Sequence, residues 1–431
     1  MQHKTASQHT AFDRRSFLQL SRFGLLLPLL GPASLFANER SAVPTETVPG
    51  LLITGIDLHV VKVNARGDWY FIELKTNKGL TGLGECSHAL SKQSSEGALK
   101  NTVQDFFQLI KGASPFNIEQ YRQRGLPKAT DKLTRTVFSG IEQALWDLSG
   151  KALEVPVYNL LGGKVRDKIR VYANINRASN QRDSNGRRAV DSFRENAALA
   201  LQHGFKAVKL APFDEMRPLK NATPQQVQED IAYAIDCIEK VRATIGKDAE
   251  LLVDVHSHLD VPLAKETARK LEPARLFWFE EPVAPGLYPA ETKEIREAIT
   301  QVLAGGESIF GREGYATLLN TQALGIIMPD VKHCGGLLEC KYIAAQAETN
   351  GNIQVAPHNP SGPVATAATV AVCAGLPNFS IMEYAFNEVP WSSQLLTPTE
   401  KVEDGYITVP DRPGLGYELN YSELKKHIKS V

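Results

Sequence analysis

Ionisable residues follow a series of apolar segments along the second half of the chain. The segment "ELLVDVH" ends with Asp254 and His256. Because side chains two positions apart on a strand share a face, we expect both to point the same way. Six successive segments from this one onward end in an ionisable group, which favours a shared site over solvated loop charges. The segment before it and the five after it end in Lys209, in the pair Glu280 and Glu281, and in Glu307, Asp330, His358 and Glu383.

Three acids from consecutive segments could form a metal site: Asp254, one of Glu280 and Glu281, and Glu307. On neighbouring strands about 4.8 Å apart, their carboxylates can converge on one point. Each pair at about 4 Å would repel by about 4 kcal/mol at an effective dielectric constant of 20. A hard divalent cation removes that cost, and oxygen ligands favour Mg²⁺ or Mn²⁺ over Zn²⁺. The sequence therefore predicts a Mg²⁺ site, with Mn²⁺ as the second choice and a metal-free acid cluster as the alternative.

Two histidines are candidates for proton transfer. Asp330 and His358 end neighbouring segments, and a carboxylate beside an imidazole fixes its tautomer and raises its basicity. This predicts His358 as a general base near neutral pH, with a structural histidine as the alternative. His256 shares its strand face with Asp254, so it would lie beside whatever the metal holds.

The elements that must position these residues alternate in type. From about residue 168, eight apolar strand-like segments alternate with seven helix-like segments. Such alternation is typical of a parallel sheet buried on both faces, and eight strands suggest a barrel with its chemistry at the C-terminal strand ends. We predict an α/β fold: a (β/α)7β modified TIM barrel over 166–390 and an N-terminal α+β capping domain over 51–165. The strand-poor segment 391–431 is expected to return to the cap.

The first 37 residues are of a different kind. Arg14 and Arg15 precede an apolar run broken by Pro and Gly, and small residues follow up to Ala37. This pattern is typical of a twin-arginine export signal, and the run is too short to span a bilayer comfortably. We expect a periplasmic protein with no stable membrane insertion after signal removal. A short membrane anchor or a disordered tail is the alternative.

Charge and composition limit the classes of binding partner. The 48 basic and 48 acidic residues give a formal net charge of zero, which gives no support for nucleic acid or an anionic membrane as partner. The five cysteines have no C-x-x-C spacing and imply no disulfide framework. We expect a homo-oligomer that binds a small molecule and no nucleic acid.

The segment ends resemble motifs of the mandelate racemase group of the enolase superfamily. They read "VDVH", "FEEP", "GGES", "MPD" and "APHNPSGP", and "GIEQALWDLSGKALEVPVYNLLGG" resembles that group's linker between cap and barrel. The resemblance covers nearly all of the chain after its first segment. It implies that Asp254, Glu280 and Glu307 bind Mg²⁺, which selects Glu280 over Glu281.

The resemblance also implies the shared reaction step. Members of this superfamily remove a proton α to a carboxylate, and here Asp330 and His358 would be the acid/base dyad. The site becomes more negative as that proton leaves, so nearby cations or donors are needed. Lys209, His256 and a protonated Glu383 are the candidates.

One departure from the family pattern narrows the reaction. Racemases of this group carry Lys-x-Lys at the second strand end, whereas here Lys209 is followed by Leu210 and Ala211. Ala211 cannot take a proton, so a two-base racemase mechanism at this position is disfavoured. The pair Asp254 and His256 instead resembles the galactonate dehydratase-like acid sugar dehydratases, in which this histidine protonates the departing β-hydroxyl. Those enzymes carry Asn where this chain has Ala211, which leaves the substrate open.

The sequence thus predicts a Mg²⁺-dependent carbon–oxygen lyase. It would abstract the α-proton of a sugar acid (an aldonate) and eliminate the β-hydroxyl, giving a 2-keto-3-deoxy sugar acid. The alternatives are a cycloisomerase of an anhydro-sugar acid or lactone, which is an intramolecular lyase, and a non-catalytic periplasmic sugar-acid binder. Two cap loops would close over the barrel mouth. Candidate substrate contacts, each with an ordinary surface role as the alternative, are Arg66, Trp69 and His88 in these loops and Trp391 after the last strand.

Overall fold

The computed structural model describes residues 48–429 except residue 93. The predicted export signal, residues 1–37, lies outside the described residues. Within them, no helix combines the length and the apolar character needed to cross a membrane.

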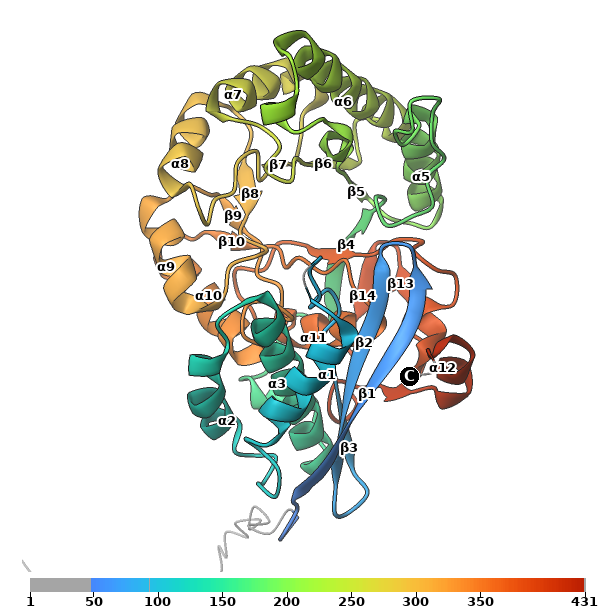
Figure 1. Ribbon diagram of the computed structural model, residues 1–431, viewed down its shortest axis with the longest axis vertical. Helices are drawn as coiled ribbons and strands as arrows, with labels where there is room; N and C mark the ends of the chain where they lie inside the picture. Colours follow the sequence, from blue (N-terminus) through green and yellow to red (C-terminus); the bar gives the residue numbers. More distant parts are fainter. Residues whose placement is uncertain (1–47, 93, 430–431) are drawn as a thin grey trace, which may run out of the picture. The chain divides into compact units, whose positions relative to one another are not determined.

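The N-terminal part is a three-stranded antiparallel sheet covered by helices (Figure 1). The long helix α3 packs on β2 and β3 and begins with a capping box, in which Asp131 and Thr134 satisfy each other's backbone N–H groups. The helix and sheet approach closely, because a Cβ atom at Gly84 would lie 1.9 Å from the carbonyl oxygen of Gly140. The elements are β1 (Ile53–Asn64), β2 (Gly67–Thr76), β3 (Thr81–Glu85), α1 (Glu96–Phe107), α2 (Ile118–Gly125), α3 (Lys132–Ala152) and α4 (Val157–Leu160).

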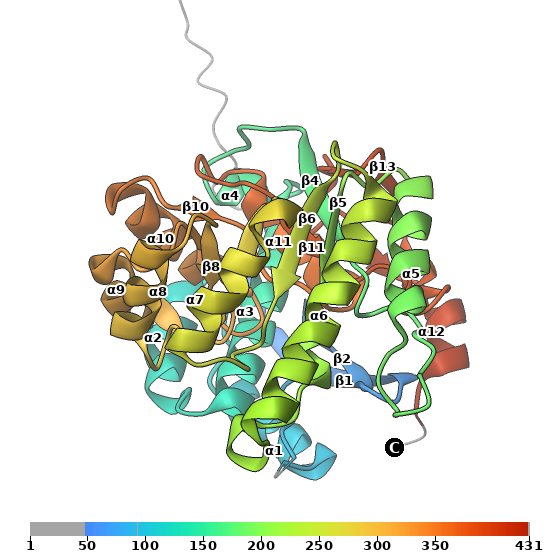
Figure 2. The same ribbon diagram turned by 90° about the horizontal axis from the view of Figure 1, so that it is seen from above.

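Eight parallel strands and seven helices follow in strict alternation and confirm the predicted (β/α)7β barrel. The strands form a ring with the helices outside it (Figure 1), and α5 and α6 pack side by side on the outer face (Figure 2). The ring closes because β4 pairs with both β5 and β11, and Val355 of β10 bridges to Phe379 just before β11. The strands are β4 (Lys168–Asn174), β5 (Ala207–Leu210), β6 (Glu250–Asp254), β7 (Trp278–Glu280), β8 (Leu303–Gly305), β9 (Ile326–Ile327), β10 (Gln354–Val355) and β11 (Met382–Tyr384). The helices are α5 (Val190–Gln202), α6 (Pro224–Ile245), α7 (Val261–Lys270), α8 (Pro289–Ala298), α9 (Gly311–Thr321), α10 (Leu337–Thr349) and α11 (Pro363–Cys373).

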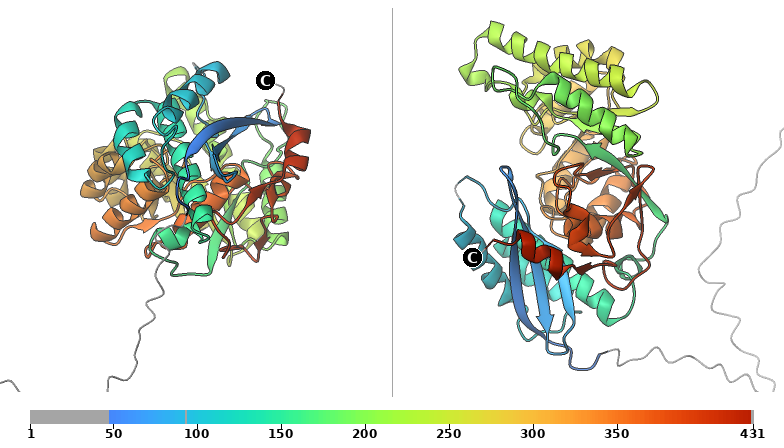
Figure 3. Two further views of the ribbon diagram at one scale, coloured as in Figure 1. Left: turned by 90° about the horizontal axis from the view of Figure 1, so that it is seen from below. Right: turned by 90° about the vertical axis from the view of Figure 1, so that its right-hand side faces the viewer.

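The C-terminal segment contacts both parts of the chain. Strand β14 (Tyr406–Thr408) pairs antiparallel with the start of β4, which extends the barrel sheet. Helix α12 (Tyr421–His427) packs on β1 of the cap, as the right-hand view of Figure 3 shows. The segment therefore reaches the cap, and it holds more strand than its sequence suggested. Its other strands are β12 (Leu396–Thr397), β13 (Val402–Glu403) and β15 (Glu418–Leu419).

Buried acids of the cap hold two barrel helices by their first turns. Glu142 of α3 accepts hydrogen bonds from the backbone N–H groups of Leu337 and Leu338 at 2.7 and 3.1 Å, where α10 begins. Glu85 of β3 accepts those of Gly362 and Ala365 at 2.9 and 2.8 Å, where α11 begins. The first N–H groups of a helix have no partner inside the helix, so these contacts satisfy donors that would otherwise be buried unpaired. The cap is thus bonded to the barrel at defined residues.

Candidate active site

The inward-facing side chains of the barrel strands change from apolar to polar or charged at the C-terminal ends of the strands. Tyr172, Ala207, Leu252, Trp278 and Ile381 form a buried apolar cluster inside the barrel. Positions two residues further along the same strands share the same face. These carry polar or charged side chains, all buried: Asn174, Lys209, Asp254, Glu280 and Glu383. The site therefore has an apolar floor, and water cannot reach its charges from below.

The three predicted metal ligands converge. Asp254, Glu280 and Glu307 each offer a carboxylate oxygen, and these oxygens lie within 4.8 Å of one another. Lys209 Nζ lies beside this cluster, 3.0 Å from Glu280 Oε1 and 3.4 Å from Glu383 Oε1. The buried Oε2 of Glu307 has no well-oriented hydrogen-bond donor among residues 48–429. An all-oxygen donor set with such an atom fits a hard divalent cation.

The electrostatics of the cluster also favour a cation. Burial, with Asp254 next in importance, raises the pKa of Glu280 well above its usual range. Burial also acts to raise the pKa of Asp254, but His256 and Lys209 outweigh it and lower that pKa. The protein's own charges therefore compensate Asp254 more fully than Glu280, and a bound cation would favour the ionised form of Glu280.

Glu281, the other acid of its pair, is turned away from this cluster by the backbone. Its Oε1 accepts a hydrogen bond from the N–H of Gly306 at 2.7 Å, and its φ of 38° lies in the left-handed region. Burial raises the pKa of Glu281 to about 8. Among the two neighbours, Glu280 is therefore the one whose carboxylate joins the other two acids.

His358 lies between the carboxylate of Asp330 and that of Glu307, one of the three predicted metal ligands. Its Nδ1 lies 2.7 Å from Oδ2 of Asp330, and its Nε2 lies 3.0 Å from Oε2 of Glu307. Asp330 is fully buried and also accepts hydrogen bonds from Lys332 N and Nζ at 2.7 and 2.6 Å. Burial favours the neutral form of Asp330, but Lys332, His333 and His358 lower its pKa well below the usual range. An ionised Asp330 thus fixes Nδ1 as the protonated nitrogen and leaves Nε2 facing the acid cluster.

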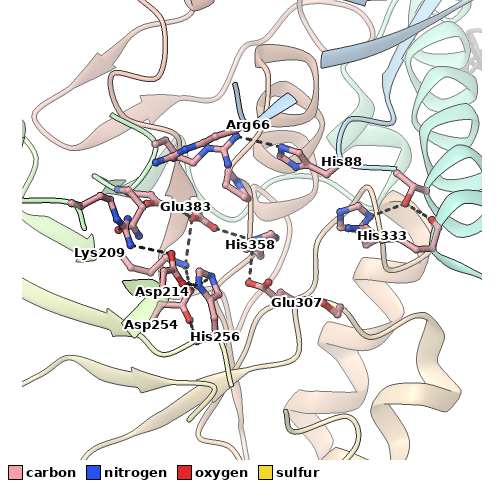
Figure 4. A pocket seen from close by; sticks show the side chains of 18 of the residues that line it. Arg66, His88, Lys209, Asp214, Asp254, His256, Glu307, His333, His358 and Glu383 are labelled. Atoms are coloured by element: carbon pink, nitrogen blue, oxygen red, sulfur yellow. Dashed lines mark hydrogen bonds and ion pairs between the residues drawn. The ribbon is translucent and has the colours of Figure 1, made fainter. Parts of the chain in front are cut away.

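His256 has the same arrangement on the other side of the cluster. Its Nδ1 lies 2.5 Å from Oδ1 of Asp214, and its Nε2 lies 2.9 Å from Oδ2 of Asp254. Burial acts to lower the pKa of His256, but Asp254 and Asp214 raise it well above the usual range. Each histidine therefore has its Nδ1 on a carboxylate outside the cluster and its Nε2 on a carboxylate of the cluster. Figure 4 shows His256 beside Asp214 and Asp254, and His358 beside Glu307.

The acid cluster opens into a cavity of about 820 Å³ between barrel and cap. Two of the predicted substrate contacts, Arg66 and His88, line this cavity. The other two are not among its lining residues. Trp69 is 2% exposed and packs against Trp391, with ring centroids 5.7 Å apart, while Trp391 stacks on His427 at 3.6 Å. The two tryptophans join the cap to the C-terminal segment and are packing residues, so their prediction as substrate contacts is not supported.

Several lining residues were not singled out from the sequence. Asp214, which orients His256, lies in the loop after β5, and Asn174 at the end of β4 donates a hydrogen bond to Glu383. Both lie at or just after the C-terminal end of a barrel strand, where the chemistry was expected, so a search of those positions could have identified them. Arg177 and Arg188 belong to the stretch "RASNQRDSNGRR", whose four arginines are visible in the sequence. His333 also lines the cavity, and burial lowers its pKa to about 3.

Comparison with known proteins agrees with this geometry. Residues 59–162 match the family described as mandelate racemase / muconate lactonizing enzyme, N-terminal domain, and residues 192–424 match enolase C-terminal domain-like. A D-galactonate dehydratase of Xanthomonas campestris pv. campestris is 32% identical over 375 residues, covering 83% of this chain and 90% of the relative. A D-xylonate dehydratase of Haloferax volcanii is 28% identical over 381 residues, covering 86% and 88%.

A solved structure agrees as well. The crystal structure of a member of the enolase superfamily from Salmonella Typhimurium is 28% identical, has a TM-score of 0.77, and covers 87% of this chain and 98% of its own. The family matches span both the cap and the barrel, and the acids at the strand ends fall within them. The chain therefore belongs to the mandelate racemase/muconate lactonizing enzyme group of the enolase superfamily.

Proposed function

We propose that the protein is a sugar acid dehydratase that acts on an aldonate-type substrate. It removes the α-proton and expels the β-hydroxyl as water, giving a 2-keto-3-deoxy sugar acid. One observation carries the proposal: two histidines face one carboxylate cluster through Nε2, and each is oriented by its own acid through Nδ1. An elimination needs one group that takes a proton and a second that gives one. The sugar acid dehydratases among the relatives support the same reaction class.

The proposal includes Mg²⁺, or Mn²⁺, held by Asp254, Glu280 and Glu307. When bound, the ion would neutralise the substrate carboxylate and stabilise the negative charge that develops on it as the α-proton leaves. Lys209 remains a cation beside this position, because burial acts to lower its pKa but Glu280 and Glu383 raise it well above the usual range. It therefore offsets part of the negative charge of the carboxylates.

The two histidines divide the proton transfers. His358 Nε2 takes the α-proton, and Asp330 stabilises the resulting imidazolium through Nδ1. The electrons of the broken C–H bond form the new double bond, and the bond from the β-carbon to its hydroxyl breaks. His256 Nε2 gives its proton to that hydroxyl, so that water leaves, and Asp214 holds Nδ1 throughout. The enol product then tautomerises to the keto acid.

The experiment is a screen of the purified protein with Mg²⁺ against stereoisomeric sugar acids, with α-keto acid and substrate both quantified. We expect one or a few acids to give one equivalent of α-keto acid per substrate consumed. If the substrate is consumed and gives a ring-opened or ring-closed product without α-keto acid, the reaction is a cycloisomerisation and not a dehydration. Binding without any turnover would mean that the protein is a sugar-acid binder and not an enzyme.

A further inference from the structure

The cavity has a strong excess of positive charge away from the acid cluster. Apart from Lys209 and the cluster itself, its lining contains three acids, Asp214, Glu215 and Glu383. Apart from Lys209, the lining also contains six lysine and arginine side chains: Arg66, Lys132, Arg135, Arg177, Arg182 and Arg188. The hydroxyl groups along the tail of an aldonate are neutral, so they do not require such a lining.

Part of this charge is not compensated by the protein. Arg188 is paired with Glu215 at 2.5 Å and Asp214 at 3.2 Å. Arg177 Nη2 is paired with Glu388 at 2.5 Å, but its buried Nε has no hydrogen-bond acceptor among the described residues. The side chain of Arg66 makes neither a hydrogen bond nor an ion pair within residues 48–429. The Nε of Arg177 is thus a buried donor without an acceptor, which is costly and indicates that a ligand supplies one. Arg66 is exposed, and its side chain lines the same cavity without a partner among the described residues.

Arg66 has both cations and acids around it, and the cations have the larger effect. Burial, then repulsion from Arg177 and Arg188, lowers the pKa of Arg66, and the opposing attraction of Glu388 and Asp214 is weaker. His88 is kept neutral for the same reasons, since burial and then Arg177 lower its pKa well below the usual range. Its Nε2 lies 3.4 Å from Arg177 Nη2. An anion beside Arg66 and Arg177 would relieve this repulsion.

These cations lie away from the reacting end of the cavity. Figure 4 shows Arg66 and His88 on one side of the pocket and Asp254, His256 and Glu307 on the other. Arg66 follows β1 in the cap, whereas Arg177 follows β4 in the barrel, so both parts of the chain contribute. A substrate whose carboxylate lies at the acid cluster would direct its tail towards this pair.

We propose that the substrate carries a second anionic group at the end distant from its reacting carboxylate, and that Arg66 and Arg177 bind it. A terminal carboxylate, phosphate or sulfate has the required charge and acceptor geometry. The inference rests on the proposed function and narrows its substrate class to dianionic sugar acids. Arg66 would then determine specificity without taking part in the proton transfers.

The test compares matched substrates that differ only at this end. Each aldonate that the protein dehydrates is compared with the aldarate of the same configuration and with the terminally phosphorylated and sulfated aldonates, in the presence of Mg²⁺. We expect at least one dianion to exceed its monoanionic partner in kcat/KM by about 10- to 100-fold, the range for one charged hydrogen bond. Which dianion does so identifies the group.

The variant Arg66→Gln provides the second measurement. Arg66 is exposed in a turn, so its replacement leaves the core intact. It should lower kcat/KM for the dianion by about 10-fold or more, mainly through KM, and should lower kcat/KM for the monoanion by a smaller factor. The matched control is Arg194→Gln, which removes one positive charge from the exposed face of α5 outside the cavity and should change neither.

Two results would overturn the inference. One is that monoanions react as well as their dianionic partners, or that Arg66→Gln lowers kcat/KM equally for both. This result would refute a second anionic group on the substrate but would not affect the dehydratase proposal. Failure of every sugar acid, monoanion and dianion alike, to react would instead refute the proposed function, and this inference with it.

Discussion

Replacing His256 by asparagine should separate the two proton transfers. The side chain of His256 is bonded through both ring nitrogens, at 2.5 Å to Asp214 and 2.9 Å to Asp254, and its raised pKa keeps it protonated. Asparagine is polar and of similar reach, but it cannot donate a proton to a departing hydroxyl. His358 keeps its 2.7 Å contact with Asp330 in this variant, so the α-proton should still be removed.

The size of the effect follows from what is lost. A general acid contributes about 10²- to 10⁴-fold to the step it serves, which corresponds to roughly 3–5 kcal/mol of activation free energy. Formation of α-keto acid by His256→Asn should fall by that factor. Exchange of the substrate α-hydrogen for deuterium should continue, provided that His358 exchanges its proton with solvent during the lifetime of the complex.

The assay is proton NMR of the substrate in D₂O with Mg²⁺. His358→Asn should lose both exchange and elimination. His258→Asn is the matched control, because His258 is a second histidine near Asp214, at 4.0 Å, but is not among the residues that line the cavity. It should behave like the unaltered protein. Exchange that survives in His358→Asn but not in His256→Asn would reverse the two roles, and full activity of His256→Asn would exclude it from the reaction.

Three further predictions concern metal, pH and export. Chelation should abolish activity, and Asp254→Asn should lose the rise in melting temperature that added Mg²⁺ gives the unaltered protein; full activity after chelation would contradict the metal site. Burial raises the pKa of Glu142 from its usual 4.5 to about 7, so the stability this group contributes is present below about pH 4.5 and lost as the pH rises through 7. The free energy of unfolding of Glu142→Gln should therefore change less over that range, by about 3 kcal/mol, in denaturant titrations; parallel curves for both proteins would refute this. Replacing Arg14 and Arg15 by lysine should keep the precursor in the cytoplasm on cell fractionation, and unchanged periplasmic recovery would argue against the proposed twin-arginine route.

The barrel and its strand-end residues could be predicted from the sequence because both depend on local pattern. Each strand is buried on both faces and reads as a short apolar run, so the first ionisable residue after it marks the mouth of the barrel. The alternation of side chains along a strand then places Asp254 above Leu252 and Glu280 above Trp278. The roles assigned to these residues, and the domain boundaries, stay predictions.

Residues whose position depends on loop paths could not be predicted in this way. The alternation of side chains along the strand did not decide which of Glu280 and Glu281 joins the metal site. The choice depends on the left-handed backbone conformation of Glu281 and on its hydrogen bond from the N–H of Gly306. Trp69 lies in a strand that is buried on both faces, and packing against Trp391 across more than three hundred residues of chain has no local signature. The contact between Asp214 and His256 likewise joins two loops, and only the structure shows it.

The pairing of β4 has a consequence for how the protein is made. The first barrel strand to leave the ribosome finds one partner, β5, soon afterwards, but its remaining partners, β11 and β14, are synthesised near the end of the chain. Until then β4 has unpaired N–H and C=O groups, and such an edge can pair with another nascent chain. The barrel can therefore close only after nearly all of its residues have been translated. A chain that stops before Met382 would leave this edge open permanently, and ribosome stalling in the last part of the message should favour aggregation over a partly active product.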